Sequence, residues 1–171
     1  MKTRLFSLLF AVLVTTFAFG QEDKSKRPSP PASAEGTIDG VKVKVDYSAP
    51  SAKGRKMLGG VEQYGKVWRT GANETTSIEF SGPVKIEGKD LAAGKYALFT
   101  IPGEKEWTII FNKTIKWGAF SYKEEEDVLR VKVAASSASA FQEKFNISVE
   151  KNKVVLRWEN TEVAFGVKGG K

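Results

Sequence analysis

The chain has 171 residues, a net charge of +7 at pH 7, and neither cysteine nor histidine. Disulfides are therefore excluded, and so are the usual sulfur and nitrogen ligands of zinc and copper and catalytic arrangements built on cysteine or histidine. The length suits one domain with a substantial core. Basic residues are scattered along the sequence, which is typical of a solvated surface, so we expect no nucleic-acid partner.

The first 20 residues have the pattern of a signal peptide. Lys2 and Arg4 precede an apolar run that ends in small residues, Ala18 and Gly20, at the positions that a signal peptidase requires. The run is short for a membrane-spanning helix, and the chain has no cysteine for a thioether-linked lipid. We therefore predict an exported protein, periplasmic or extracellular, with no membrane anchor after cleavage.

Residues 21–32 are polar, charged and proline-rich, with Pro28, Pro30 and Pro31. This composition cannot bury a core and predicts an extended tether. At the other end, residues 169–171 are predicted to form a disordered tail. The single folded domain is expected over residues 33–168.

Within that domain, apolar and polar residues alternate with a period of two, the pattern of antiparallel strands with one buried face. The alternation covers residues 41–47, 76–80, 129–133, 145–149, 154–158 and 163–167. Residues 96–101 and 107–111 are apolar on both faces and are expected to lie centrally. Hairpin turns are predicted at residues 39–40, 102–105 and 151–153. Only residues 136–144 could form a helical turn or two.

Many short strands separated by frequent turns are typical of a β-sandwich or barrel. We predict an all-β fold, an antiparallel β-sandwich of jelly-roll or immunoglobulin-like type. The expected core aromatics are Trp107, Trp158, Phe80, Phe99 and Phe165. Trp68 and Trp117 lie beside glycine or turn residues and are the two tryptophans that could line a groove.

The segment WRTGANE (residues 68–74) concentrates four side chains suited to recognition: Trp68, Arg69, Asn73 and Glu74. Aromatic stacking combined with a bidentate guanidinium suits a glycan, a small carboxylate or a loop of a partner protein. The alternative is structural. In that interpretation Gly65 and Gly71 supply turns, while the tryptophan and arginine fix a long loop onto the domain.

Two further charged segments are candidates for ion binding. Lys53, Arg55 and Lys56 lie among glycines in a loop that could cradle an anion. Residues 124–127 form an acidic run without the alternating spacing and glycine of a calcium loop, so we expect a solvated connection. We predict neither a metal nor a cofactor.

Catalysis without histidine or cysteine leaves three designs: a carboxylate pair, a serine-lysine dyad, or a metal held by oxygen ligands. Glu74 is the best candidate for a carboxylate-based hydrolase acting on a glycan, although no partner carboxylate can be identified from the sequence. Ser51 lies near Lys53, but such proximity is close to random in this composition. We therefore favour a non-catalytic binding or interaction module, with the hydrolase as the alternative.

Several segments together resemble a family of exported bacterial proteins, the domain-of-unknown-function family 2911, common in Bacteroidetes-type bacteria. The segments are RPSP (27–30), VDYSAP (45–50), KGRK (53–56), YGKVWRTGANE (64–74), AGKYALFTIP (93–102) and EWTIIFNK (106–113). The resemblance covers roughly residues 27–168 and implies an exported all-β domain. It implies no activity and no catalytic residues, because the family has no established function to transfer.

Overall fold

The computed structural model describes residues 23–116 and 121–170. The predicted signal peptide, Trp117 and Lys171 lie outside these ranges. The described chain contains two short 3-10 helices, η1 (Lys24–Lys26) and η3 (Glu124–Glu126). Within the described ranges, no helix has the length and apolar character needed to cross a membrane.

Nine strands make up the rest of the regular structure. They are β1 (Pro31–Ile38), β2 (Val41–Ser48), β3 (Ser77–Phe80), β4 (Val84–Ile86), β5 (Lys89–Leu91), β6 (Gly94–Ile101), β7 (Glu106–Asn112), β8 (Asp127–Glu150) and β9 (Lys153–Gly169). All pairings are antiparallel, in the order β1-β2-β3-β6-β7-β8-β9-β4-β5. The all-β antiparallel prediction is confirmed. The described strands form one open sheet, where a jelly-roll or immunoglobulin-like fold would divide them between two.

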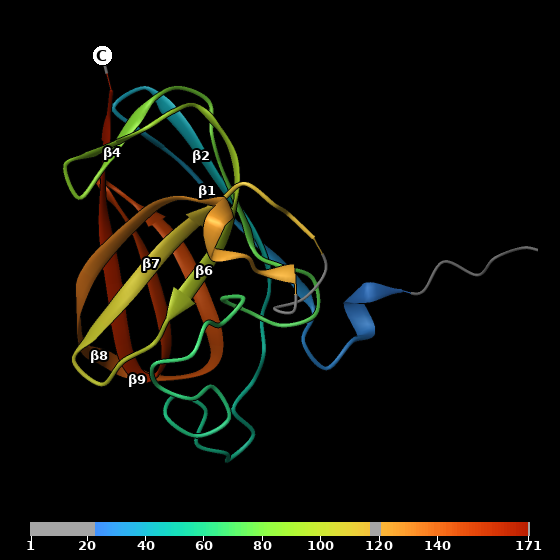
Figure 1. The fold of residues 1–171 in the computed structure, drawn as a ribbon. Helices are drawn as coiled ribbons and strands as arrows, with labels where there is room; N and C mark the ends of the chain where they lie inside the picture. Colours follow the sequence, from blue (N-terminus) through green and yellow to red (C-terminus); the bar gives the residue numbers. More distant parts are fainter. Residues whose placement is uncertain (1–22, 117–120, 171) are drawn as a thin grey trace, which may run out of the picture.

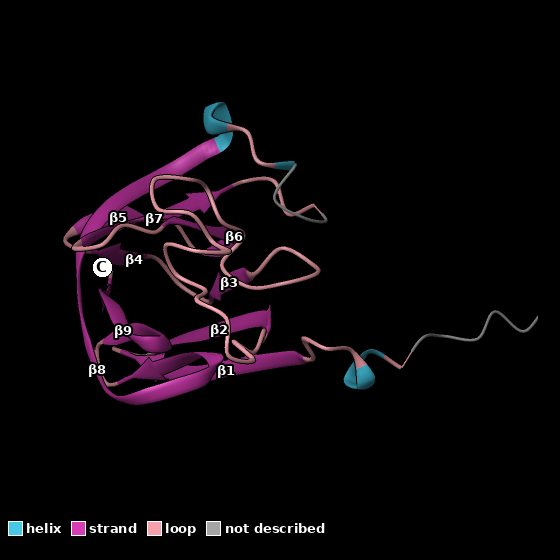
Figure 2. Cartoon of the chain, turned by 90° about the horizontal axis from the view of Figure 1, so that it is seen from below, coloured by secondary structure: helices cyan, strands magenta, loops and turns pink. Residues whose placement is uncertain are grey.

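The long strand β8 makes this sheet curl. It pairs with β7 as far as Ala134 and then with β9 from Ala135 onward, with register shifts between Ser137 and Gln142 and between Gln142 and Asn146. Such bulges bend a strand and increase its twist. As a result β1 and β2 lie beside β8 and β9, across the molecule from β6 and β7 (Figures 1 and 2). The possible helical turn at residues 136–144 is part of this bent strand.

The main core lies inside the curl and is rich in aromatic rings. All five aromatics that were predicted to be buried are buried, and Trp107, Trp158, Phe80 and Phe165 belong to this core. Phe99 instead belongs to a small cluster with Ala97 and Ile110 on the opposite, outward face of β6 and β7. The ring of Tyr122 covers this cluster, with its centroid 5.1 Å from that of Phe99.

The predicted turn at Asp39-Gly40 is confirmed as a two-residue hairpin loop between β1 and β2. Both residues have positive φ, 48° and 81°, as tight hairpins of this length require. The hairpin between β4 and β5, which was not predicted, has the same loop conformation at Glu87-Gly88, with φ of 48° and 81°.

The ordered domain extends beyond the boundaries predicted at both ends. Strand β1 begins at Pro31, two residues inside the predicted tether, and the carbonyl of Pro30 accepts a hydrogen bond from Ala49 N (2.9 Å). Strand β9 continues to Gly169, and Gly170 N donates to the Pro83 carbonyl (2.8 Å). Backbone hydrogen bonding to neighbouring strands therefore overrides the polar composition of both segments.

Candidate functional site

Trp68 lies in the main core, so its ring is not available to a surface ligand. Only 2% of the residue is exposed. Its indole stacks on Trp158 with ring centroids 5.6 Å apart and contacts Phe145 edge-on at 5.0 Å. The indole N–H donates to the Gly71 carbonyl (3.0 Å). For this residue the structural interpretation applies, because the ring holds the 64–74 segment onto the sheet.

Arg69 is half-buried, and its Nε is enclosed without a hydrogen-bond partner among the described residues. Its positive charge acts electrostatically on the half-buried Glu62. Burial raises the pKa of Glu62, and the positive charge of Arg69 partly opposes this rise. The two side chains belong to one loop region and do not lie in the groove described below. Arg69 therefore does not line the groove to which Glu74 belongs.

Asn73 and Glu74 hold the segment that precedes β1, residues 23–30, which we call the N-terminal segment. The Asn73 amide donates to the Ser29 carbonyl (2.9 Å). The Glu74 carboxylate accepts from Lys24 Nζ (2.9 Å) and from Arg27 (3.0 Å). Asn73 has φ of +56°, a conformation that asparagine tolerates better than most residues. The predicted tether is thus fixed to the domain by ion pairs and hydrogen bonds.

These contacts also set the charge of Glu74. The hydrogen bond from Lys24, helped by the residue's own backbone N–H and by Arg27, lowers the pKa of Glu74 from 4.5 to about 2. A lowered folded-state pKa stabilises the fold above the unfolded value, and the benefit is lost as the pH falls from 4.5 towards 2. Because 39% of the side chain is exposed, solvent screening keeps this contribution small.

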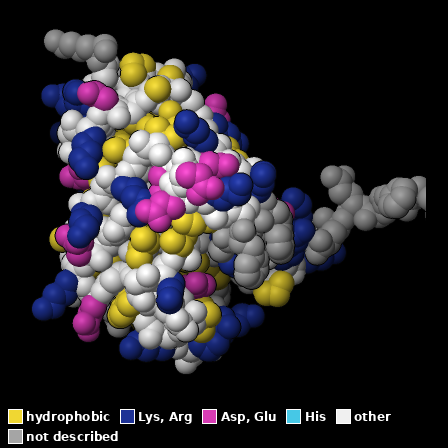
Figure 3. Space-filling model, in the orientation of Figure 1, with side chains coloured by type: hydrophobic (Ala, Val, Ile, Leu, Met, Phe, Trp, Pro, Cys, Tyr) yellow, Lys and Arg dark blue, Asp and Glu magenta, His cyan; other side chains and the backbone are white. Residues whose placement is uncertain are grey.

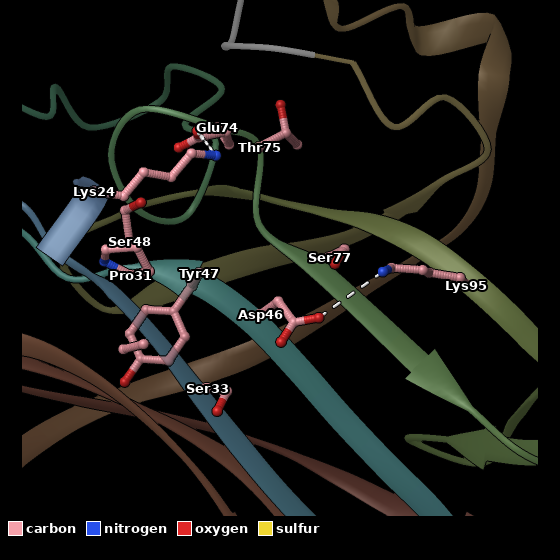
Figure 4. A pocket seen from close by; sticks show the side chains of 11 residues that line it. Lys24, Pro31, Ser33, Asp46, Tyr47, Ser48, Glu74, Thr75, Ser77 and Lys95 are labelled. Atoms are coloured by element: carbon pink, nitrogen blue, oxygen red, sulfur yellow. Dashed lines mark hydrogen bonds and ion pairs between the residues drawn. The ribbon is translucent and has the colours of Figure 1, made fainter. Parts of the chain in front are cut away.

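Beside the N-terminal segment lies an open groove of about 500 Å³ on the outward face of β1, β2 and β3. It is lined by Lys24, Pro31, Ala32, Ser33, Asp46, Tyr47, Ser48, Glu74, Thr75, Ser77 and Lys95. We call it the hydroxyl groove. Figure 4 shows Lys24 reaching Glu74 at one end and Lys95 pointing to Asp46 at the other, an ion pair of 3.8 Å.

Three serines between these ion pairs give the groove its name. Ser33, Ser48 and Ser77 come from β1, β2 and β3, and Ser33 and Ser77 flank Asp46 in the strand pairing. No described residue hydrogen-bonds any of the three hydroxyls. A hydroxyl both donates and accepts, so this row offers unused hydrogen-bonding capacity to a ligand. None of these residues except Glu74 was predicted, because they come from three separate strands with no local motif.

The predicted anion loop uses part of its hydrogen-bonding capacity on the protein itself. Arg55 donates through Nε to the Ala52 carbonyl and through a terminal nitrogen to the Ser51 carbonyl, both at 3.0 Å. Lys53 N donates to the Glu143 carboxylate (2.7 Å), which brings negative charge to the loop. The side chains of Lys53 and Lys56 are exposed. An anion at this loop would therefore face a neighbouring carboxylate.

The acidic run at residues 124–127 is only partly solvated. Asp127 accepts from Asn112 (2.8 Å), Tyr122 (2.9 Å) and Arg130 (2.5 Å). Burial, followed by the hydrogen bond to Asp127, raises the pKa of Tyr122 to about 12. Among the described residues, no group of three acidic side chains is arranged to hold a metal ion. Through Asp127 the run contributes to a partly buried polar network at the end of β7.

The surface charges agree with the scatter seen in the sequence. On the face shown in Figure 3, basic and acidic side chains are interspersed over the domain. Lys44 forms ion pairs with Glu35 (3.3 Å) and Asp46 (3.6 Å) on the outward face of β1 and β2. Lys44 is thus paired with two acids, and the face shown in Figure 3 carries no field of a single sign.

Comparison with known proteins identifies the family of this chain. A family model described as "Protein of unknown function (DUF2911)" matches residues 29–167. Neither the curated proteins nor the solved structures gave a match. The match covers nearly the whole described domain, including the hydroxyl groove apart from Lys24. The chain belongs to the DUF2911 family.

Proposed function

We propose that this protein is an exported, non-catalytic binding module whose hydroxyl groove takes a neutral, hydroxyl-rich ligand, namely a glycan. The observation that carries the proposal is the row of three hydroxyls, those of Ser33, Ser48 and Ser77, that no residue of the described ranges hydrogen-bonds. Hydroxyl ligands need neighbours that both donate and accept, and serines next to charged groups provide them. The groove volume of about 500 Å³ lies within the usual range of small-molecule sites.

The charges around the groove favour a neutral glycan over a small carboxylate. A carboxylate ligand would need a free cation, but Lys24 already pairs with Glu74, and Lys95 pairs with Asp46. A carboxylate that displaced Lys24 or Lys95 would break one of the two ion pairs of Glu74 or of Asp46, leaving only Arg27 or Lys44 as the remaining partner. The paired side chains keep the capacity to hydrogen-bond sugar hydroxyls, since an ion pair does not use all the donors of a lysine or all the lone pairs of a carboxylate.

The same charges count against the alternative of a glycan hydrolase. Carboxylate-based hydrolysis needs one acid that stays protonated to assist the leaving group, beside a second that is ionised. Glu74, with its pKa of about 2, is ionised at neutral pH and unsuited to donate a proton. Asp46, the other carboxylate of the groove, pairs with Lys44 and Lys95. We therefore propose binding without catalysis.

The experiment is a calorimetric titration of residues 21–171 with a panel of neutral and acidic oligosaccharides and small carboxylates. The informative variant is Ser33→Ala/Ser77→Ala, because neither hydroxyl hydrogen-bonds a described residue and their removal should leave thermal stability unchanged. Ser139→Ala, an exposed serine of β8 outside the groove, is the matched control. We expect heat with neutral oligosaccharides that the double variant loses and the control retains. Equal binding by the double variant would refute the groove as the site.

A further inference from the structure

A second groove adjoins the hydroxyl groove on the same outward face of the sheet. It has a volume of about 530 Å³ and is lined by side chains of β1, β2 and β3, among them Thr37, Lys42 and Glu79. Its lining also includes Glu35, Lys44 and Ser81. Both grooves are open to solvent, and β1, β2 and β3 contribute outward-pointing residues to both.

The strand pairing places the two grooves one after the other along β1 and β2. Along β1 and β2 the outward pairs follow in the order Ser33 with Asp46, then Glu35 with Lys44, then Thr37 with Lys42. The first pair lines the hydroxyl groove, and the next two line the second groove. At about 3.4 Å per residue, the path from Pro31 to Thr37 extends roughly 20 Å.

The boundary between the grooves is a side chain rather than a packed wall. Lys44 stands there, paired with Glu35 on one side and Asp46 on the other, and 48% of it is exposed. An exposed ion pair of this kind costs little to rearrange, since such pairs contribute about 0–1 kcal/mol. A ligand that is longer than one groove can therefore pass over or displace Lys44.

The second groove repeats the chemistry of the first. The Thr37 hydroxyl, the Lys42 ammonium and the Glu79 carboxylate have no side-chain partner among the described residues. The charges of Lys42 and Glu79 are of opposite sign and cancel, so the groove offers hydrogen-bonding groups without favouring a charged ligand. A uniform polymer of neutral, hydroxyl-rich units would find similar partners along the whole path.

We infer that the two grooves are successive subsites of one site, and that the ligand is a linear chain of neutral sugar units lying along the outward face of β1, β2 and β3. The inference rests on the proposed function, because it extends the hydroxyl groove and assumes that a glycan occupies it. It adds a length requirement: affinity should depend on the number of linked units until both grooves are filled.

The test is a length series of soluble β-1,4-linked glucose and N-acetylglucosamine oligomers, from disaccharide to hexasaccharide, titrated calorimetrically. The hexasaccharide should bind roughly tenfold or more tightly than the disaccharide, which corresponds to about 1.4 kcal/mol of added contacts. The variant Lys42→Ala/Glu79→Ala should bind the hexasaccharide no better than the disaccharide and leave disaccharide binding unchanged. Lys132→Ala/Glu106→Ala, which removes an exposed ion pair of 2.9 Å between β7 and β8, is the charge-matched control.

The outcomes separate the two proposals. Disaccharide binding that the Ser33→Ala/Ser77→Ala variant abolishes, with no gain on lengthening, would overturn the linear-chain inference and leave the hydroxyl groove in place. A gain on lengthening that the Lys42→Ala/Glu79→Ala variant retains would overturn the second groove as the additional subsite. If no oligomer of either series binds, the neutral-glycan proposal fails and the inference fails with it.

Discussion

Replacing Trp68 with alanine should strongly destabilise the fold, since the structure places this residue in the core. A buried tryptophan removes about 150–250 Å² from water, which at about 25 cal/mol per Å² amounts to roughly 4–6 kcal/mol for the whole side chain. Alanine keeps a small part of that area, and measured substitutions of buried phenylalanine or tryptophan cost about 3–5 kcal/mol. The change also removes the stacking on Trp158 and the hydrogen bond to Gly71.

We therefore expect Trp68→Ala to lower the free energy of unfolding by about 4 kcal/mol and the melting temperature by roughly ten degrees. The assay is urea denaturation followed by circular dichroism, with thermal melting in parallel. Phe141→Ala is the control, because Phe141 is 55% exposed and its loss should change stability by no more than about 0.5 kcal/mol. If Trp68→Ala costs less than about 1 kcal/mol, the ring does not belong to the core, and the recognition patch regains its aromatic member.

Three further predictions concern Glu74, the glycines Gly71 and Gly65, and Asp127. Glu74→Gln should change global stability by less than about 1 kcal/mol but increase amide hydrogen exchange in the N-terminal segment. In the wild type the same increase in exchange should develop as the pH falls from 4.5 towards 2. Amide protection that does not depend on pH would contradict this prediction. Gly71→Ala should destabilise the fold by about 2 kcal/mol or more, since the residue has φ of +157° and a Cβ would lie 2.9 Å from two oxygen atoms. Gly65→Ala is the control, because the space around Gly65 is open and the change should cost only about 1 kcal/mol. Chemical denaturation measures both. Asp127→Asn should lower the pKa of Tyr122 from about 12 part of the way towards 10 in an ultraviolet titration, and an unchanged value would show that burial alone raises it.

Alternation of apolar and polar residues predicted most of the fold correctly because most strands bury one face. Strand β1 escaped prediction because its inward positions are Ala32, Ala34 and Gly36, whose side chains give little hydrophobic contrast. Their small size has a packing reason: a Cβ at Gly36 would lie 2.6 Å from Val149 of β8. The position where β1 packs closely against β8 is therefore one where the sequence gives little hydrophobic signal.

The extent of β8 and β9 could not be predicted from local pattern either. Each was expected as two separate short strands, with a possible helical turn at residues 136–144 between those of β8, because the alternation breaks at their bends. In β8 the break coincides with the register shifts between Ser137 and Asn146. In β9 it lies at Glu159, which has φ of +51° and accepts backbone hydrogen bonds from Met57 and Leu58. These bends depend on contacts about a hundred residues away in the chain.

The candidate site likewise depends on contacts between residues that are distant in the sequence, which local pattern does not predict. The composition of residues 68–74 predicted a recognition patch, but it could not show where the side chains lie. Trp68 is buried in the core, and Glu74 pairs with Lys24, fifty residues earlier. The serines of the hydroxyl groove carry no motif, since their significance comes from register between β1, β2 and β3. Only the strand pairing brings them together.

The most direct test of the account is backbone amide shift mapping by NMR on isotope-labelled residues 21–171, titrated with a neutral linear hexasaccharide. The account predicts that the largest shifts lie at Ser33, Ser48 and Ser77 and continue along β1 and β2 to Thr37 and Lys42. Shifts centred instead on the loop of Lys53, Arg55 and Lys56, or no shifts with any oligosaccharide of the panel, would contradict it.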